Sequence, residues 1–255
     1  MRNISIMLKV ELLEAVRNIK FIWLTIFFTI LGVTQPLIDK YMEVILKQFG
    51  GVEGIMIDPN APKPQANEVL LATFSGQFNQ IGLIVLIISF MGMMANEKNS
   101  GVQGFIFTRP VSSLEYISAK LCGNWFISMV CISIGAFVSY FYTIYLFGYY
   151  SIANFLLFLV FYSLWIFFIV SIAALFSTLI KNPLFIGVAT ILLSIVLLLL
   201  GGINETFSLF LPSGVLTLAE SLLLQMESPN FLLIIAPIVY ITINVYAAKL
   251  FINQV

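Results

Sequence analysis

Six long apolar segments restrict the fold of this chain more than any other feature. A helix rises about 1.5 Å per residue, so about 20 apolar residues are needed to cross the hydrocarbon core of a bilayer. We predict membrane-spanning helices at Phe21–Ile38, Gln77–Ala95, Leu121–Phe147, Asn154–Ile180, Leu184–Leu200 and Leu232–Leu250. These segments lack the alternation of apolar and polar residues that a membrane β-barrel requires. The predicted fold class is therefore all-α: a polytopic integral membrane protein with six transmembrane helices, in a single domain over residues 1–255.

The composition excludes a soluble fold. Of the 255 residues, 60% are hydrophobic and 9% are charged, whereas soluble domains average about 45–50% apolar and about 25% charged residues. The net charge is zero, so no basic field indicates nucleic acid as a partner. Cys122 and Cys131 both lie in an apolar stretch, which favours small packing residues over a disulfide or a metal pair.

Residues 1–20 are predicted to form an amphipathic helix in the membrane interface. One helical arc holds Ile4, Leu8, Leu12, Ala15, Val16 and Ile19, and Lys9, Arg17 and Lys20 lie off that arc. No small-residue cleavage site follows the first apolar segment, so we expect that span to be retained rather than removed with a signal peptide. A solvated leader is the alternative interpretation.

The basic residues predict the orientation in the membrane. With six spans and the N-terminus inside, the cytoplasmic segments hold Arg2, Lys9, Arg17, Lys20, Lys98, Arg109, Lys120, Lys181 and Lys249. Lys40, Lys47 and Lys63 remain outside, and most acidic residues also lie there. Because short cytoplasmic loops are enriched in Lys and Arg, we predict a multi-pass protein of the cell (plasma) membrane with both termini in the cytoplasm.

Two external segments are expected to be more than short connections. Residues 39–76 are predicted to form a long external loop, because they contain several glycines and prolines. Residues 201–231 contain an apolar patch at Leu216–Leu224 that is too short to span. We interpret this second segment as a re-entrant or interfacial helix pair between the fifth and sixth spans.

Missing motifs argue against an enzyme. The chain has no histidine and no GxxxxGK[ST] sequence, which excludes HExxH metal sites, serine–histidine catalysis and a P-loop. We therefore predict no catalytic, metal or cofactor-binding residue in this chain. The spans contain almost no ionisable groups, and this disfavours an ion-coupled carrier.

The segment 96–120 between the second and third spans concentrates charge. It contains Glu97, Lys98, Arg109, Glu115 and Lys120. Ser112 and Glu115 have the spacing of a capping box, which predicts a helix from about Ser113 toward the third span. Pro110 disfavours helix at Arg109. The residues alone are also compatible with an ordinary solvated turn whose basic side chains snorkel.

The pattern Glu97, Gly101, Arg109-Pro110-Val111-Ser112 and Lys120 resembles the loop signature of the permease family of ABC-2 type transporters. The amphipathic leader, the six spans and the interrupted segment before the last span are also similar to that family, so the resemblance covers essentially the whole chain. Ser113 departs from the pattern, because the family often has a basic residue there.

The resemblance implies partners and site residues. It implies a permease that pairs with a second permease chain, identical or related, and that binds a cytoplasmic ABC ATPase subunit through the leader helix and the 96–120 coupling loop. ATP and Mg would be bound by that ATPase. The ATPase-coupling residues would be Glu97, Gly101, Arg109, Pro110, Glu115, Lys120, Arg17 and Lys20. Gly187 and Ser194 offer a small surface for dimer packing.

The implied function is export, driven by ATP, of an amphipathic or hydrophobic substrate such as an antimicrobial peptide, an antibiotic or a lipid-linked compound. Two alternatives remain open at this point. One is a non-transporting membrane scaffold or sensory subunit, in which the external loop would be the working part. The other is a secondary carrier.

Overall fold

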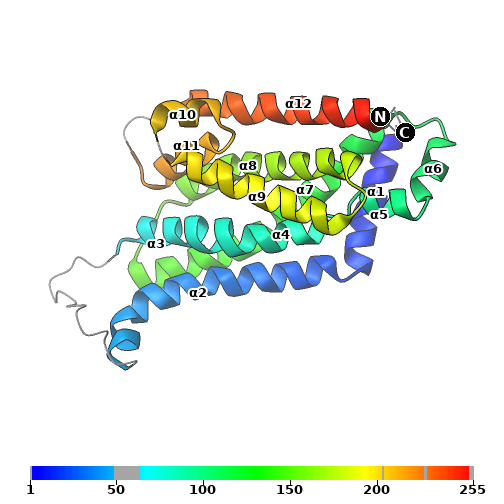
Figure 1. Ribbon diagram of the computed structural model, residues 1–255. Helices are drawn as coiled ribbons and strands as arrows, with labels where there is room; N and C mark the ends of the chain where they lie inside the picture. Colours follow the sequence, from blue (N-terminus) through cyan, green and yellow to red (C-terminus); the bar gives the residue numbers. More distant parts are fainter. Residues whose placement is uncertain (1, 49–63, 203, 227–228, 253–255) are drawn as a thin grey trace.

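The chain folds into a bundle of helices with roughly parallel axes and one helix across its end (Figure 1). The structure is a computed structural model that describes residues 2–48, 64–202, 204–226 and 229–252. The elements are α1 (Arg2–Arg17), α2 (Lys20–Gln48), α3 (Ala66–Ala72), the π-helix η1 (Thr73–Gly82), α4 (Leu83–Phe90), α5 (Ala95–Asn99), α6 (Val102–Phe107), α7 (Ser113–Phe147), α8 (Ile152–Leu179), α9 (Pro183–Gly201), α10 (Glu205–Phe210), α11 (Gly214–Leu223), the 3-10 helix η2 (Phe231–Ile234) and α12 (Ile235–Ile252).

The prediction of an all-α polytopic membrane protein is confirmed. No strand occurs in the part of the chain that the structure describes. Six helical stretches in it are long and apolar enough to cross a membrane: Lys20–Met42, Ala66–Asn99, Ser113–Phe147, Ile152–Leu179, Pro183–Gly201 and Phe231–Ile252. An even number of crossings brings the start of α1 and the end of α12 to the same end of the bundle, which we call the terminal end (Figure 1). We call the opposite end the distal end.

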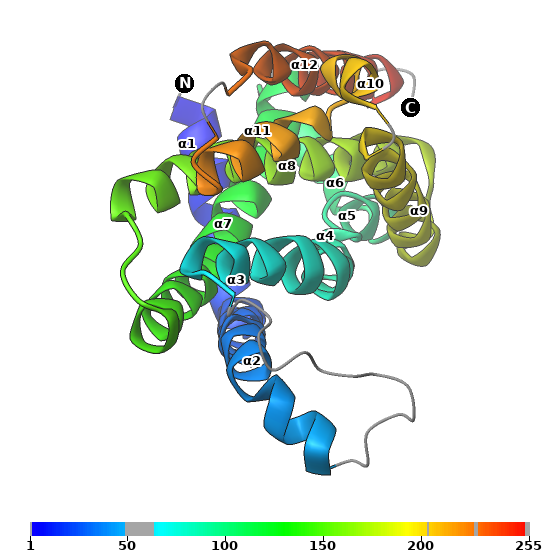
Figure 2. The same ribbon diagram turned by 90° about the vertical axis from the view of Figure 1, so that its left-hand side faces the viewer.

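The central helices of the bundle are α7 and α8. Viewed from the distal end, α2 lies at the margin and reaches the bundle mainly through α7 (Figure 2). Around α8 the core is aromatic, because Phe74 of η1 packs against Phe158 and Tyr162 with ring centroids 4.4 and 5.4 Å apart. Trp165 is fully buried one turn further along α8. These contacts hold the second span against α8.

A pair of glycines sets the crossing of α2 and α7. A Cβ atom on Gly32 would collide with the carbonyl oxygen of Gly135, and a Cβ atom on Gly135 would collide with that of Phe28. The two backbones therefore touch directly at this level. Small residues allow such close packing of helices within membranes, where dispersion contacts rather than water exclusion hold them together.

Helix α1 lies across the terminal end, perpendicular to the spans (Figure 1). This is the orientation expected of an interfacial helix. The predicted arc is only partly correct: Ala15 is buried, but Val16 is exposed, and Ile19 lies beyond the end of the helix with a φ of 58°. The turn at Ile19 redirects the chain into α2. The face of α1 that packs against the bundle includes Glu11 as well as apolar residues. The exposed face of α1 carries a second apolar stripe of Ile6, Val10, Leu13 and Val16.

The segment predicted as an external loop, 39–76, is helical at both ends. Helix α2 continues through Pro36 to Gln48, and α3 begins at Ala66. A proline within a membrane helix is tolerated where neighbouring groups satisfy the freed carbonyl. The glycines and prolines that motivated the prediction, Gly50, Gly51, Gly54, Pro59 and Pro62, lie outside the described residues.

Between the fifth and sixth spans, α10 and α11 form a pair of short helices at the distal end (Figure 1). Helix α11 is apolar but has 10 residues, too few to cross a bilayer. Its C-terminal end is fixed by Tyr150, whose hydroxyl donates a hydrogen bond to the carbonyl of Leu223 at 2.6 Å. Tyr140 in turn donates to the carbonyl of Tyr150 at 2.8 Å. The second predicted segment therefore consists of short helices, of which α11 packs against α8 and α10 packs against α9 and α11.

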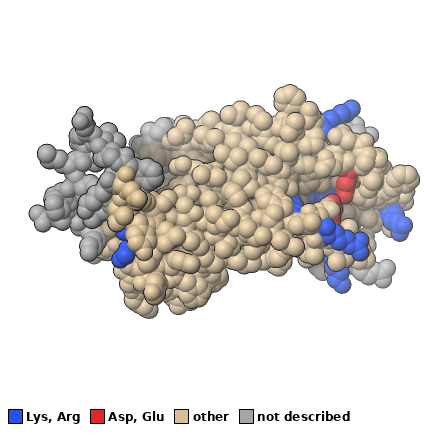
Figure 3. Space-filling view, turned by 90° about the horizontal axis from the view of Figure 1, so that it is seen from below, with Lys and Arg blue, Asp and Glu red and all other residues tan. Residues whose placement is uncertain are grey.

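Charged side chains gather at the terminal end. On the face in Figure 3, Lys and Arg side chains cluster there, and the middle of the face shows only uncharged residues. Lys40 lies at the distal end, where its ammonium group is 5.9 Å from the ring centroid of Phe147. A charge-free band of this kind is what burial in hydrocarbon requires, because ionised groups are costly there.

Candidate functional site

A buried cluster of charges joins three elements at the terminal end. The ammonium group of Lys120, on α7, is 2.5 Å from a carboxylate oxygen of Glu11 on α1. It is also 2.5 Å from a carboxylate oxygen of Glu97 on α5. The second oxygen of Glu97 accepts a hydrogen bond from the hydroxyl of Tyr116 at 2.7 Å. Only 3% of Lys120 is exposed. We call these four residues the charge cluster.

The local sequence explains how α7 contributes to this cluster. Ser112 caps α7, because its hydroxyl accepts from the amide of Glu115 at 3.2 Å and the Glu115 carboxylate accepts from the amide of Ser112 at 3.0 Å. The predicted capping box is therefore confirmed. The helix that it starts runs on as the third span without interruption. Tyr116 and Lys120 are four residues apart, so they lie on the same face of α7.

Gly101 lets the chain bring α5 and α6 together. Its φ of 76° is in the left-handed region, which glycine adopts without strain. Helix α5 ends just before it and α6 begins just after it, so the chain reverses direction at the surface of the bundle. Two further hydrogen bonds join this segment to the end of α8 and the residues after it. The side chain of Lys98 donates to the carbonyl of Thr178 at 3.3 Å, and that of Asn99 donates to the carbonyl of Lys181 at 2.8 Å.

The electrostatics of the charge cluster favour a tight, ordered arrangement. Burial raises the pKa of the Glu11 carboxyl, and the neighbouring Lys120 opposes that rise. One ammonium group is shared by two carboxylates, and each carboxylate away from water needs that partner. Separating α1 from α7 would leave the Glu11 carboxylate partly buried without its cationic partner. The cluster therefore fixes the position of α1 relative to the coupling loop.

A groove between α1 and α6 borders the charge cluster, and Glu11, Glu97 and Lys120 contribute to its lining. It has a volume of about 470 Å³. Apolar side chains form its walls, with Ile6 and Val10 from α1 and Val102 and Phe105 from α6. Phe105 is 76% exposed, which is unusual for a phenylalanine outside a lipid or protein contact. We call this feature the α1–α6 groove.

Two of the predicted residues stand at the edge of the α1–α6 groove. The guanidinium group of Arg109 is exposed and has no hydrogen-bond or ion-pair partner among the described residues. Next to it, the carbonyl of Pro110 accepts a hydrogen bond from the side chain of Asn3 at 3.0 Å. The turn between α6 and α7 is thereby attached to the beginning of α1. The groove thus combines apolar walls with an arginine that is unpaired among the described residues, and residues of the charge cluster also line it.

The predicted coupling residues lie in different parts of the structure. Glu97 and Lys120 lie inside the charge cluster, Glu115 caps α7, and Gly101 turns the chain. Arg109 and Pro110 border the α1–α6 groove. Lys20 begins α2, and its ammonium group donates to the side-chain oxygen of Asn124 at 3.0 Å. Arg17 is exposed at the end of α1. Their role in coupling stays a prediction.

Sequence reasoning missed Glu11 and Tyr116 as members of the site. A signal for Glu11 was present: it falls on the same side of α1 as Leu8, Leu12 and Ala15, where an unpaired carboxylate would be unfavourable. An acid on an otherwise apolar helix face indicates a buried basic partner. Lys120, at the start of the third apolar segment, was the candidate partner.

The small residues predicted for dimer packing, Gly187 and Ser194, lie on the inner face of α9. A Cβ atom on Gly187 would be 2.9 Å from the sulfur of Met91 in the same chain. Ser194 is fully buried, and its hydroxyl donates to the carbonyl of Thr190 at 2.6 Å. This face is therefore occupied by the chain's own helices. The outer face of α9, with Leu184, Phe185, Val188, Leu192 and Leu199, is exposed instead.

Comparisons with known proteins agree with this architecture. A family model described as "ABC-2 family transporter protein" matches residues 5–248. The chain is also similar to the uncharacterized transmembrane protein YxlG of Bacillus subtilis (strain 168), with 33% identity over 238 residues. That alignment covers 91% of this chain and 89% of the relative. The matched residues include the charge cluster, most of the α1–α6 groove, five candidate spans in full and most of the sixth.

Proposed function

This chain belongs to the ABC-2 family of transporter proteins, and on that premise we propose that it is the permease subunit of an ABC exporter, driven by a separate cytoplasmic ATPase. The observation that supports the proposal best is the α1–α6 groove, which presents an exposed phenylalanine and an unpaired arginine at the charged end of a membrane bundle. Apolar centres surrounded by polar residues are typical of protein interfaces.

The charge cluster supplies the mechanical connection in this proposal. A force applied to α5 or α1 reaches α7 through Lys120, because the ion pairs on both sides of that side chain resist separation. Since α7 is one uninterrupted helix from Ser113 to Phe147, movement at its first turn tilts the whole span. In this mechanism Glu97, Glu11 and Lys120 position the elements, and Arg109 and Phe105 contact the ATPase.

The remaining parts of the proposal concern placement and partners. The gathering of basic side chains at the terminal end supports a cytoplasmic location for both termini in the plasma membrane. ATP and Mg would be held by the ATPase, and this chain would hold neither. A second permease chain would complete the path. The substrate is proposed to be amphipathic or hydrophobic.

The test is co-purification of the affinity-tagged permease with an ATPase from its native membrane. The variant is the double reversal Arg17→Glu and Arg109→Glu, because both side chains are exposed and their reversal leaves the charge cluster intact. The control is Lys181→Glu, a charge reversal of the same kind at one exposed site outside the groove. We expect ATP hydrolysis in the purified complex for the wild type and the control, and its loss in the double variant.

A cross-linking experiment locates the proposed contact between the permease and the ATPase. A photoreactive residue in place of Phe105 should cross-link to the ATPase, whereas one in place of Tyr145, exposed near the distal end of α7, should not. The proposal is refuted if no ATPase accompanies a folded wild-type permease. It is equally refuted if the double reversal retains the hydrolysis of the wild type and Phe105 forms no cross-link.

A further inference from the structure

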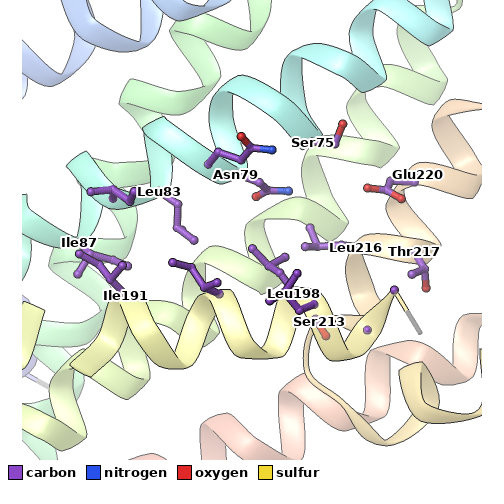
Figure 4. A pocket seen from close by; sticks show the side chains of 16 residues that line it. Ser75, Asn79, Leu83, Ile87, Ile191, Leu198, Ser213, Leu216, Thr217 and Glu220 are labelled. Carbon is purple, nitrogen blue, oxygen red and sulfur yellow. The ribbon is translucent and has the colours of Figure 1, made fainter. Parts of the chain in front are cut away.

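A second cavity lies within the bundle toward the distal end (Figure 4). Its volume is about 500 Å³, which is within the range of pockets that hold small molecules, about 300–1,000 Å³. The walls come from η1 and α4 of the second span, from α9 and from the short helix α11. We call it the distal cavity. It is separate from the α1–α6 groove, with which it shares no lining residue.

The two ends of the distal cavity differ in polarity. One end is apolar, where Leu83 and Ile87 face Ile191 and Leu198 across the space (Figure 4). At the other end the lining includes Ser75 of η1 and Thr217 and Glu220 of α11, and the hydroxyls of Ser75 and Thr217 donate to carbonyls of their own helices. Most of the lining is therefore hydrocarbon, with a small number of polar groups at one end. A ligand that matches this surface has an apolar body and one polar head.

Glu220 defines the chemistry of that head. Its side chain points from α11 toward the part of η1 that carries Ser75 (Figure 4). The carboxylate has no hydrogen-bond or ion-pair partner among the described residues, and no lysine or arginine lines the cavity. Partial burial raises the pKa of this carboxyl, but nothing in the cavity compensates its charge. A carboxylate in an apolar recess is stabilised most by a cationic hydrogen-bond donor.

The facing wall is built from irregular helix. Residues Thr73–Gly82 form a π-helix of 10 residues, and π-helical segments are rare and occur frequently at functional sites. Within it, Asn79 is buried and its side-chain oxygen accepts a hydrogen bond from Tyr162 at 3.1 Å. This contact fixes the amide, and its nitrogen has no partner among the described residues. The second span thus places the fixed side chain of Asn79 at the cavity, within a segment that is π-helical rather than α-helical.

We propose that the distal cavity binds an amphipathic organic cation, whose positive group pairs with Glu220 and whose apolar body lies between α4 and α9. The inference rests on the proposed function, since it assigns a substrate class to the permease. Shape and apolar contact select for a hydrophobic body, and the unpaired carboxylate selects for positive charge. A hydrophobic anion of the same size has the same apolar contacts but is repelled by Glu220.

The test uses purified permease in a non-ionic detergent, without any ATPase. Decylammonium and decanoate are the probes, because each has one charged head on a similar apolar chain and the two heads have opposite charge. Equilibrium dialysis should show saturable binding of the cation and much weaker binding of the anion. Replacing Glu220→Gln should weaken cation binding about tenfold or more, the effect of losing one charge-assisted contact, and should not weaken anion binding.

Two further variants make the result decisive. Glu68→Gln makes the same chemical change at an exposed site on α3, outside the cavity, and should leave cation binding unchanged. Ile191→Trp fills the apolar end and should weaken binding of both probes. The inference is overturned if the wild type binds both probes equally, if Glu220→Gln and Glu68→Gln have the same effect, or if Ile191→Trp leaves cation binding intact. Each result is independent of ATPase co-purification, so the two proposals can fail separately.

Discussion

Lys120 of α7 forms an ion pair with Glu11 of α1, with 2.5 Å between the ammonium nitrogen and the carboxylate oxygen. The pair attaches the helix that lies across the terminal end to the third span. The side chains of Lys120 and Glu11 are only 4% and 12% exposed, so water has little access to either charge. This pair and three other local features lead to five predictions, and each can be measured on the purified protein or in intact cells.

Removing the shared cation should destabilise the fold strongly. Replacing Lys120→Met leaves the partly buried carboxylates of Glu11 and Glu97 without their shared cation, although Tyr116 still donates to Glu97, and loss of one partner of a buried ion pair costs about 3–5 kcal/mol. Thermal unfolding in detergent should show a large fall in the transition temperature. The exposed Lys9→Met on α1 is the control and should change stability by about 0.5 kcal/mol or less.

A double-mutant cycle separates the ion pair from the loss of packing. Adding Glu11→Gln to Lys120→Met removes one of the two orphaned charges, so the double variant should be more stable than the sum of the two single changes predicts. Strict additivity, or an unchanged transition temperature in Lys120→Met, would show that the cluster does not join α1 to α7.

Gly135, at the crossing of α2 and α7, should not tolerate replacement by a residue that has a Cβ atom. In Gly135→Ala the new methyl group would collide with the carbonyl of Phe28, and overpacking of this kind costs about 1–3 kcal/mol. Gly104→Ala is the matched control, because its methyl group meets no atom within 4 Å. We expect a lower unfolding temperature for Gly135→Ala alone. Equal temperatures for both variants would contradict the close approach of the two helices.

Loss of the capping box should loosen the first turn of α7. Ser112→Ala removes the acceptor for the Glu115 amide, a change that costs about 1 kcal/mol. Hydrogen exchange at Glu115 and Tyr116 should accelerate, whereas exchange in the middle of α7 should not change. Ser112→Thr keeps the hydroxyl and should retain most of the protection. Equal exchange in Ser112→Ala and the wild type would mean that other contacts hold this turn.

The orientation of the bundle can be tested with single cysteines. In a background with Cys122→Ala and Cys131→Ala, Lys40→Cys and Lys249→Cys place thiols at the distal and terminal ends. A membrane-impermeant maleimide should label residue 40 in intact cells. It should label residue 249 only after permeabilisation, because the basic terminal end is expected in the cytoplasm. The reverse pattern would invert the proposed topology.

The sequence predicted those features that depend on local composition. Six apolar segments determined the number of spans, since no other fold covers so much hydrocarbon. Ser112 and Glu115 determined the start of α7, because a capping box is formed by residues within one turn. The amphipathic leader was also predictable, although its precise arc was not, since the turn at Ile19 ends the helix earlier than periodicity indicated.

The extent of several helices was not predictable. The glycines and prolines of residues 39–76 indicated a loop from residue 39 on, yet α2 continues to Gln48. Likewise the spacing of Gly187 and Ser194 indicated a contact surface but could not distinguish packing against the same chain from packing against a second one. Met91, on another span, decides that question, because it fills the space beside Gly187.

The sequence by itself determined the class of this protein, its spans and the loop in which its charges concentrate, because hydropathy and capping act over a few residues. Only the tertiary structure decided which charges meet. Glu11, Glu97 and Lys120 lie on three different elements, and Glu220 faces η1 from a short helix near the other end of the chain. Such contacts depend on the packing of distant helices, which sets the partner of each buried charge and leaves Glu220 without one among the described residues.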